Sequence, residues 1–372
     1  MNLGRFISKW RFDVWIFVPM LVLLILSLAI LYSLALSLGD ISFSNFYRQL
    51  IFVPIGMAIL LLVSMIDYRW FYHYAHWGYV VSVLLLIGVL FFGENFRGTT
   101  GWFSFGGFVW QPVEIVKILW VLWLGNFFVN SNFREYPLRS LIISAVALTL
   151  LVVLIMAQPD LGSAALLIVT WLGLVFLLSF KRKYIIGLLV ILLAISFISW
   201  SFILADYQKD RISTFINPQS DPLGSGYNVR QSIIAIGAGE LWGRGIAQGT
   251  QSQLRFLPES HTDFIFAVIG EELGFVGVIA VITAWLFIFI RMYSLGTRTR
   301  DNFSSIALAG FVIIIGSQVI VNIGMNVGLL PVTGLGLPFV SYGRSSLLAT
   351  FIAFGIIMNI GRSVRKGEHR LF

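Results

Sequence analysis

Ten long apolar runs constrain the fold of this chain more than any other feature. Each has roughly 18 or more residues, enough to cross about 30 Å of hydrocarbon as a helix. Because lipid offers the backbone no hydrogen-bond partners, runs of this length form helices. The runs cover about 14–37, 47–66, 74–92, 111–130, 139–157, 161–180, 184–204, 263–290, 303–328 and 345–361. We predict an all-α polytopic membrane helix bundle of about ten transmembrane helices, in which residues 1–372 form one domain.

Composition excludes an ordinary soluble domain. Apolar residues make up 58% of the chain and charged residues 11%, and the mean hydropathy is +0.90. The absence of cysteine excludes disulfides and thiolate chemistry. The first apolar run is too long for a signal peptide and no A-x-A-like cleavage site follows it, so we expect an uncleaved first helix.

The basic residues predict the orientation, since Lys and Arg are enriched in cytoplasmic loops. Ten spans place both termini on one side, where the short loops and termini hold sixteen Lys and Arg against three on the other side. The sixteen are Arg5, Lys9, Arg11, Arg69, Arg134, Arg139, Lys181, Arg182, Lys183, Arg291, Arg298, Arg300, Arg362, Arg365, Lys366 and Arg370, and the three are Arg48, Arg97 and Arg344. Both termini are therefore predicted to be cytoplasmic. The basic residues are divided among loops instead of forming one patch, so nucleic acid is not an expected partner.

Two external connections are long. Residues 93–110 form a glycine-rich loop, and residues 205–262 form a second one of 58 residues. The second carries too many apolar residues for a disordered segment, so we predict that it is structured. Within it, Val229–Ala238 is predicted to be a short amphipathic helix at the membrane interface, closed by Gly237 or Gly239.

A third external connection, Leu329–Arg344, contains two prolines and three glycines. Such a segment does not form a regular helix, and non-helical backbone at membrane depth is tolerated where it lines a cavity. One interpretation is a re-entrant wall of a site that includes Ser341. An ordinary tight loop is the alternative.

Asp263 is the first candidate for chemistry. It follows Thr262, a good N-cap for the predicted eighth helix, and helix dipoles near that end favour an ionised carboxylate. An ionised, partly desolvated acid that faces the external medium can accept a proton from a substrate hydroxyl. The alternative is that Asp263 only caps the helix, and the residues alone favour this alternative slightly.

Three other acids lie close to Asp263 in the sequence. Glu259 is a candidate neighbour in the site, whereas Glu271 and Glu272 lie eight and nine residues further along the helix. Acids at that depth are functional or belong to buried pairs. We expect structural pairing, with Lys117 or Arg255.

Three more charged residues, Glu114, Lys117 and Asp160, lie in or beside the predicted helices. Glu114 and Lys117 are three apart on the predicted fourth helix, so they share a face and can pair. A structural ion pair and a diphosphate-binding site are equally compatible with this spacing. Asp160 either caps the sixth helix or contacts a substrate or metal. No metalloprotease, Walker A or nucleophile-elbow motif is present, and one histidine beside Asp263 does not make a metal site.

Several of these stretches together resemble the SEDS family (shape, elongation, division and sporulation proteins). The densest match is Asn217–Gly274, supported by QPVE with Lys117, by QPDLGS at Gln158–Ser163 and by Gly328–Gly343. The GTQSQL run before FLPE is more similar to the elongation members than to the division members. The chain departs from the family at Arg344, where a second glycine is usual, and at Thr100-Gly101, where a basic residue commonly precedes the tryptophan.

The resemblance implies a peptidoglycan glycosyltransferase of the elongation machinery in the bacterial cytoplasmic membrane. Its substrate would be lipid II, a disaccharide-pentapeptide on undecaprenyl diphosphate, and its partner a class B penicillin-binding protein that supplies the transpeptidase. The essential acid of the family matches Asp263, and Glu114, Lys117 and Asp160 match other motif positions.

The expected reaction is an inverting glycosyl transfer with Asp263 as the base. Lys117, Arg255 and Arg244 are candidate cations for the leaving diphosphate, with Glu259 and Ser341 completing the expected substrate-binding set. No cofactor is expected to be obligatory, although a divalent Mg or Mn ion is a further candidate. A lipid-linked precursor flippase and a non-catalytic scaffold remain as alternatives. The clustering of polar residues on the external side, together with the lack of an internal repeat, argues against the flippase.

Overall fold

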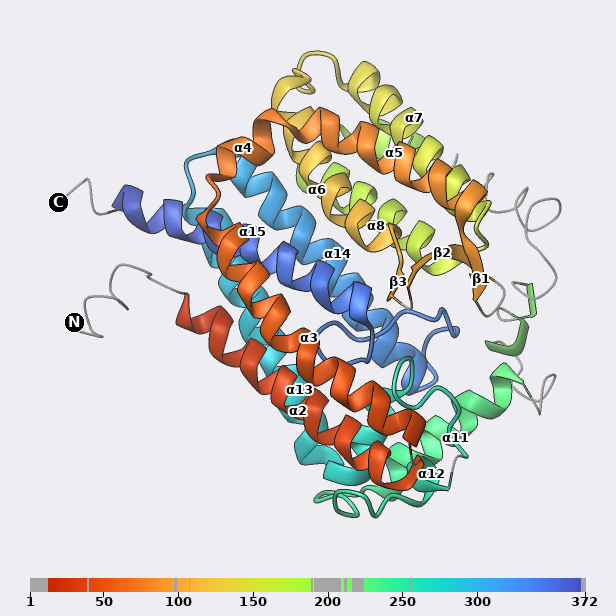
Figure 1. Cartoon of the computed structure of the whole chain (residues 1–372). Coiled ribbons are helices and arrows are strands. Elements are labelled where there is room, and N and C mark those ends of the chain that lie inside the picture. Colours follow the sequence, from red (N-terminus) through yellow and green to blue (C-terminus); the bar gives the residue numbers. More distant parts are fainter. Residues whose placement is uncertain are drawn as a thin grey trace.

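The structure is a computed structural model that describes residues 13–38, 40–96, 99–106, 108–188, 190, 209–210, 213–215, 224–254 and 256–368. In this part of the chain it is a bundle of helices with one small sheet (Figure 1). The elements are α2 (Val14–Leu38), α3 (Asp40–Met65), α4 (Tyr68–His73), α5 (Ala75–Phe92), β1 (Glu94–Phe96), β2 (Thr99–Phe105), β3 (Phe108–Trp110), α6 (Val113–Asn130), α7 (Pro137–Met156), α8 (Leu161–Leu177), α11 (Ser225–Ala238), α12 (Thr250–Gln253), α13 (Ile265–Arg298), α14 (Asn302–Asn326) and α15 (Arg344–Glu368).

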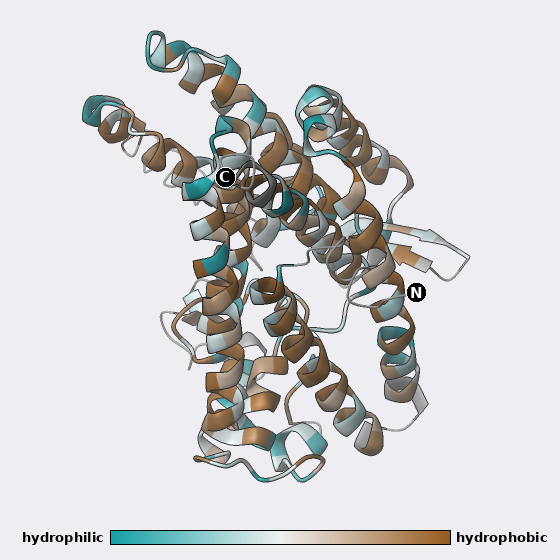
Figure 2. Ribbon diagram, turned by 90° about the vertical axis from the view of Figure 1, so that its left-hand side faces the viewer, coloured by the Kyte–Doolittle hydropathy of each residue, from teal (hydrophilic) through white to brown (hydrophobic). Residues whose placement is uncertain are grey.

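The predicted membrane helices are present wherever the structure describes them. Eight helices of the described part are long and apolar enough to cross a membrane, and Leu161–Leu177 is a shorter apolar helix. Most of the predicted span 184–204 lies outside the described residues, although 182–188 is helical. Figure 2 shows hydrophobic residues along the helices, with hydrophilic residues most frequent at their ends and in the connections.

Two groups of helices share α14. On one side α3 packs against α2 and α15, and α13 packs against α2; on the other, α5 and α7 pack around α6 and α8. α14 contacts α6, α8 and α13, and in Figure 1 it runs between the two groups. Gly56 allows the closest approach of α3 to α15, since a Cβ there would overlap the ring of Phe351.

The connection at residues 93–110 was predicted only as a glycine-rich loop, and the structure forms strands there that the prediction did not include. It forms a three-stranded antiparallel sheet in the order β1-β2-β3, and β2 packs against α5. Thr99–Phe105 reads TTGWFSF, and its threonine and aromatic residues are types enriched in strands, although Gly101 lies within the strand.

The connection between α14 and α15 enters the protein interior. It has no regular helix between Pro331 and Gly343, yet Leu337, Phe339 and Val340 are at most 1% exposed. The segment is therefore buried and is not an ordinary surface turn, whereas its role as the wall of a site stays a prediction. We call residues 331–343 the re-entrant segment.

The helix predicted at Val229–Ala238 is confirmed and begins earlier, as α11, with Gly239 at its C-cap. The residues that follow α11 pack onto a break in α13 at Gly274, where φ is 65° and ψ is −160°. The amides of Arg244 and Gly245 donate to the carbonyls of Glu271 and Glu272 at 2.9 and 3.0 Å. In return, the amides of residues 275 and 276 donate to the carbonyls of residues 240 and 241 at 2.9 and 3.3 Å.

The ends of the helices define two faces of the bundle. α2 begins and α15 ends on the left in Figure 1, whereas the sheet, α11 and α12 lie on the right. The turn before α13 and the start of α15 belong to this second face, which therefore carries the polar residues considered next.

Candidate functional site

Asp263 lies in a turn just outside α13 and is half-buried. The helix begins at Ile265 with Phe264 as its N-cap, and Phe264 makes no side-chain cap hydrogen bond within the described structure. The predicted cap at Thr262 is therefore wrong, as is the placement of Asp263 in the first helical turn. The physical reason is a tight turn on Glu259, whose carbonyl accepts from the amides of Thr262 and Phe264 at 3.1 and 3.3 Å. The Thr262 hydroxyl is engaged with the same residue, at 3.1 Å from Glu259 Oε2.

The main chain around Asp263 is fixed by bonds from two other elements. Nδ2 of Asn322 and Nδ2 of Asn326, both on α14, donate to the Asp263 carbonyl at 3.0 Å. From the re-entrant segment, the amide of Tyr342 donates to the carbonyl of His261 at 2.9 Å, and the Ser341 hydroxyl donates to the carbonyl of Thr262 at 2.5 Å. The carbonyls of His261, Thr262 and Asp263 are therefore each bound by α14 or by the re-entrant segment.

The carboxylate of Asp263 faces the re-entrant segment at Gly334. A Cβ built on Gly334 would lie 3.8 Å from Asp263 Oδ2, and φ at Gly334 is +76°. Glycine tolerates this left-handed conformation without strain. The backbone can therefore approach the acid closely.

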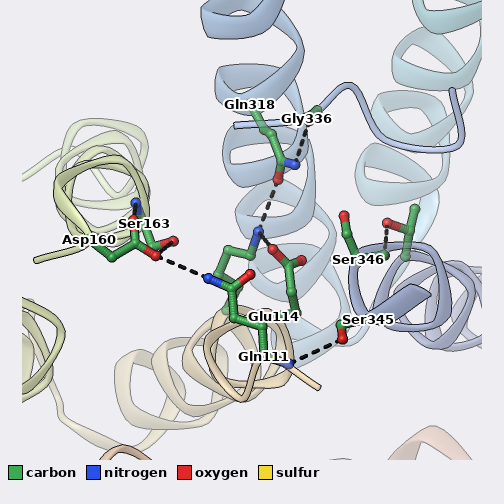
Figure 3. Close-up of polar contacts among 10 residues, drawn as sticks. Gln111, Glu114, Asp160, Ser163, Gln318, Gly336, Ser345 and Ser346 are labelled. Carbon is green, nitrogen blue, oxygen red and sulfur yellow. Dashed lines mark hydrogen bonds and ion pairs between the residues drawn. The ribbon is translucent and has the colours of Figure 1, made fainter. Parts of the chain in front are cut away.

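Glu114 and Lys117 form the predicted ion pair, with 2.9 Å between Lys117 Nζ and Glu114 Oε1. Both are buried, and Lys117 also donates to Gln318 Oε1 at 3.1 Å. Gln318 in turn donates to the carbonyl of Gly336 at 2.9 Å, as Figure 3 shows. These three polar side chains line a mostly apolar pocket between α6, α14 and α15, beneath Pro338.

Asp160 caps α8, as one of the two alternatives predicted, and its contact with substrate stays a prediction. Its carboxylate accepts from the amide and the hydroxyl of Ser163 at 2.9 and 2.7 Å. It also accepts from Gln111 Nε2 at 3.3 Å, and the Gln111 amide donates to Ser345 Oγ at 3.1 Å (Figure 3). Hydrogen bonds of Gln111 thus link the start of α6 to the starts of α8 and α15.

This geometry belongs to a chain whose residues 11–366 match the family model FTSW_RODA_SPOVE, described as cell cycle protein. The chain is a SEDS protein.

The relatives of this SEDS protein match it over almost its whole length. It is 37% identical to the peptidoglycan glycosyltransferase MrdB of Escherichia coli K12 over 360 residues, which are 96% of each chain. It is 32% identical to a probable peptidoglycan glycosyltransferase FtsW of Nitrosomonas europaea, over 94% of this chain and 92% of that one.

Two solved structures share its fold. One chain comes from a study of how a peptidoglycan synthase complex coordinates polymerization and crosslinking, with a TM-score of 0.80 and 28% identity over 95% of this chain and 98% of that one. The other is the rod shape determining protein RodA of Thermus thermophilus, with a TM-score of 0.69 and 27% identity over 95% and 97%. The SEDS protein described here is a bacterial membrane protein and a peptidoglycan glycosyltransferase, and it resembles RodA.

Two further predicted cations of this SEDS protein are Arg244 and Arg255. The guanidinium of Arg244 is exposed on the α11–α12 connection, where it donates to the carbonyl of Ala238 at 3.1 Å and to Thr250 Oγ1 at 3.5 Å. Arg255 lies outside the described residues. No hydrogen bond or ion pair joins Arg244 to Asp263 among the described residues.

Glu271 and Glu272 are buried structural acids, but the predicted pairing with Lys117 is wrong. Glu271 accepts from the amides of Gln251 and Ser252 at 2.7 and 2.9 Å, at the start of α12. Glu272 accepts from Ser33 Oγ at 2.6 Å and from Gln253 Nε2 at 3.1 Å. Backbone amides and neutral side chains donate to these acids, although Glu272 Oε2 has no partner among the described residues, and Lys117 is held by Glu114 on its own helix.

Three amide side chains of α14 were not among the residues predicted from the sequence. Gln318, Asn322 and Asn326 recur every four residues in an apolar helix, and all three are buried. A spacing of four places them on one helix face. Polar residues on one face inside a membrane helix are themselves a signal of a polar interior or a site.

Proposed function

We propose that this SEDS protein polymerises lipid II at the outer face of the cytoplasmic membrane during cell elongation, by an inverting glycosyl transfer with Asp263 as the general base. The observation that carries this proposal is the position of Asp263. Its carboxylate is half-buried, stands outside the helix and faces Gly334 on a fixed turn. A general base requires this combination of access to substrate and defined geometry.

In the proposed step, a hydroxyl oxygen of the acceptor sugar attacks the anomeric carbon of the growing glycan chain. Asp263 accepts the hydroxyl proton as the new C–O bond forms. The bond from the anomeric carbon to the diphosphate breaks on the opposite side, and its electron pair leaves with undecaprenyl diphosphate. By analogy with glycosidases, inversion needs no carboxylate nucleophile, so one acid at this position suffices.

The leaving diphosphate needs positive charge, because its negative charge grows as the bond breaks. We propose Lys117, Arg244 and Arg255 as the cations, with Glu114, Asp160, Glu259 and Ser341 contacting or shaping the substrate site. Lys117 is the described cation that lines a pocket. A divalent Mg or Mn ion is a further candidate for this charge, and among the described residues no three His, Cys, Asp or Glu side chains lie together as a metal site. Measuring activity after chelation by EDTA, with and without added Mg or Mn, tests whether such an ion takes part in the reaction.

The proposed orientation places both termini in the cytoplasm and the turn of Asp263 outside. The basic loops support it, since the side with the termini carries most of the Lys and Arg. The chain has no cysteine, so single cysteines report accessibility without background. A cysteine at the exposed Trp242 should react with a membrane-impermeant maleimide in intact cells, and one at the exposed Arg300 should react only after lysis.

A class B penicillin-binding protein is the proposed partner. One structural neighbour belongs to a peptidoglycan synthase complex in which polymerization and crosslinking are coordinated. A polymerase alone makes glycan strands, and crosslinking needs a transpeptidase. Addition of the purified partner should therefore change the product from linear to crosslinked strands.

Polymerisation of lipid II by the purified chain in detergent is the deciding experiment, with products resolved on gels. Asp263→Asn should abolish glycan strands while the protein stays folded. Asp301→Asn is the matched control, because Asp301 caps α14 through the amide of Ser304 at 2.8 Å and asparagine caps equally well. Wild-type turnover by Asp263→Asn would exclude the base assignment. A flippase would make no polymer in detergent, and a scaffold would tolerate Asp263→Asn in growing cells.

A further inference from the structure

Asn322 and Asn326 are the described side chains that hold the carbonyl of Asp263. Both are fully buried on α14. Burying an amide in an apolar helix costs free energy unless it is hydrogen-bonded, and an apolar side chain would avoid that cost. Asn322 Oδ1 has no hydrogen-bond partner among the described residues, so part of the cost is not recovered. A specific task for these amides explains their presence.

Asn326 contacts both sides of the turn that carries Asp263. Its Nδ2 donates to the Asp263 carbonyl at 3.0 Å, and its Oδ1 accepts from the amide of Ala267 at 3.1 Å. Ala267 is the third residue of α13, the position whose amide an N-cap side chain ordinarily binds. Asn326 thus acts as an N-cap of α13 from a different helix.

Asn322 connects the same carbonyl to the re-entrant segment. Its Nδ2 donates to Asp263 at 3.0 Å and to the carbonyl of Leu335 at 2.8 Å. One residue on, the carbonyl of Gly336 accepts from Gln318, which also binds Lys117. One face of α14 therefore binds both the carbonyl of Asp263 and the backbone of the re-entrant segment that its carboxylate faces.

We propose that Asn322 and Asn326 are positioning residues for glycosyl transfer, which act by fixing the backbone of Asp263 against the re-entrant segment. This inference rests on the proposed role of Asp263 as the base. Two donors on one carbonyl leave the residue little freedom to shift or rotate. A displacement of about 1 Å at a reacting group can lower a rate by about 100-fold.

If Asn322 and Asn326 were merely structural, removing them would affect stability and activity no differently from removing another buried asparagine. Asn359 is that matched control. It is a buried asparagine on α15 whose Nδ2 donates to the carbonyl of Ser64 at 2.7 Å. It makes the same kind of bond away from Asp263. Asn359→Ala therefore reports the loss of stability caused by removing one buried amide.

The experiment measures kcat and KM for lipid II polymerisation, with the thermal midpoint of each purified variant. Asn322→Ala and Asn326→Ala should lower kcat by about 100-fold, with KM within about twofold of wild type. Asn359→Ala should lower the thermal midpoint about as much as Asn322→Ala and Asn326→Ala do, and should retain the wild-type kcat. Asn326→Asp keeps the acceptor for Ala267 and, when ionised, loses the donor to Asp263, so it should be equally slow.

The outcomes separate this proposal from the one on which it rests. If Asp263→Asn is inactive but Asn322→Ala and Asn326→Asp keep the wild-type kcat, the positioning role is wrong and the base assignment stands. If Asn359→Ala loses kcat as strongly as the α14 variants, the amides are only structural. If Asp263→Asn keeps full activity, the base assignment itself fails.

Discussion

The hydroxyl of Ser341 bridges two segments, because it accepts from the amide of Leu337 at 2.7 Å and donates to the carbonyl of Thr262 at 2.5 Å. One side chain thereby closes the re-entrant segment on itself and attaches it to the residue before Asp263. The candidate site is thus made of two segments that are far apart in the sequence.

Ser341→Ala should lower polymerisation because it releases this attachment, and it should lower the free energy of unfolding by about 1 kcal/mol. Strand synthesis on gels and thermal unfolding measure the two effects. The comparison is Ser64→Ala, which removes a hydroxyl bond of 2.8 Å to Leu61 within one helix. Equal activity of the two variants would show that the Ser341 bridge does not affect the reaction.

Lys117→Met should destabilise the protein by about 3–5 kcal/mol, because Glu114 would then be a buried charge without its partner. The double variant Lys117→Met with Glu114→Gln should recover most of that stability. If Lys117 contacts the diphosphate, the double variant remains inactive although it is stable. Restored polymerisation in the double variant would assign the pair a structural role only.

Asp160→Ala should cost about 1 kcal/mol of stability, because it removes the cap of α8. Asp160→Asn should retain the stability, since asparagine is also a strong N-cap. Thermal unfolding and polymerisation of both variants therefore separate the charge from the cap. Full activity of the asparagine variant would remove Asp160 from the substrate-binding set.

Glu271→Ala should loosen the region around α12, because two backbone amides lose their buried acceptor, at a cost of about 2 kcal/mol. Hydrogen exchange of residues 249–254 should rise. Glu240→Gln is the control, since Glu240 is exposed. Unchanged exchange in Glu271→Ala would mean that other contacts order α12.

Apolar run length predicted the helices because it reports a physical requirement of the bilayer. It could not locate the start of α13, where Thr262 is a good cap by residue type. In the fold the Thr262 hydroxyl contacts Glu259, and Asn326 caps the helix instead. Asn326 lies on α14, 59 residues after Ala267 in the chain, and local pattern carries no information about such a distant partner.

The candidate site was predictable only where its contacts are local in the sequence. Glu114 and Lys117 are three residues apart, so helix geometry alone brings them together. Glu271 could not be assigned its partners, because the amides of α12 reach it only after the chain has folded back. Local pairs follow from sequence, whereas contacts between distant segments require the fold.

The break at Gly274 limits how the part of this enzyme around α11 and α12 can move. Four backbone groups of α13 have their partners in residues 240–245 rather than in their own helix. Withdrawal of that segment would leave these groups unpaired inside a helix that is apolar enough to cross the membrane, at several kcal/mol for each. Residues 240–245 therefore move with α13 as one rigid unit, and any opening that admits lipid II or releases the glycan strand must hinge elsewhere.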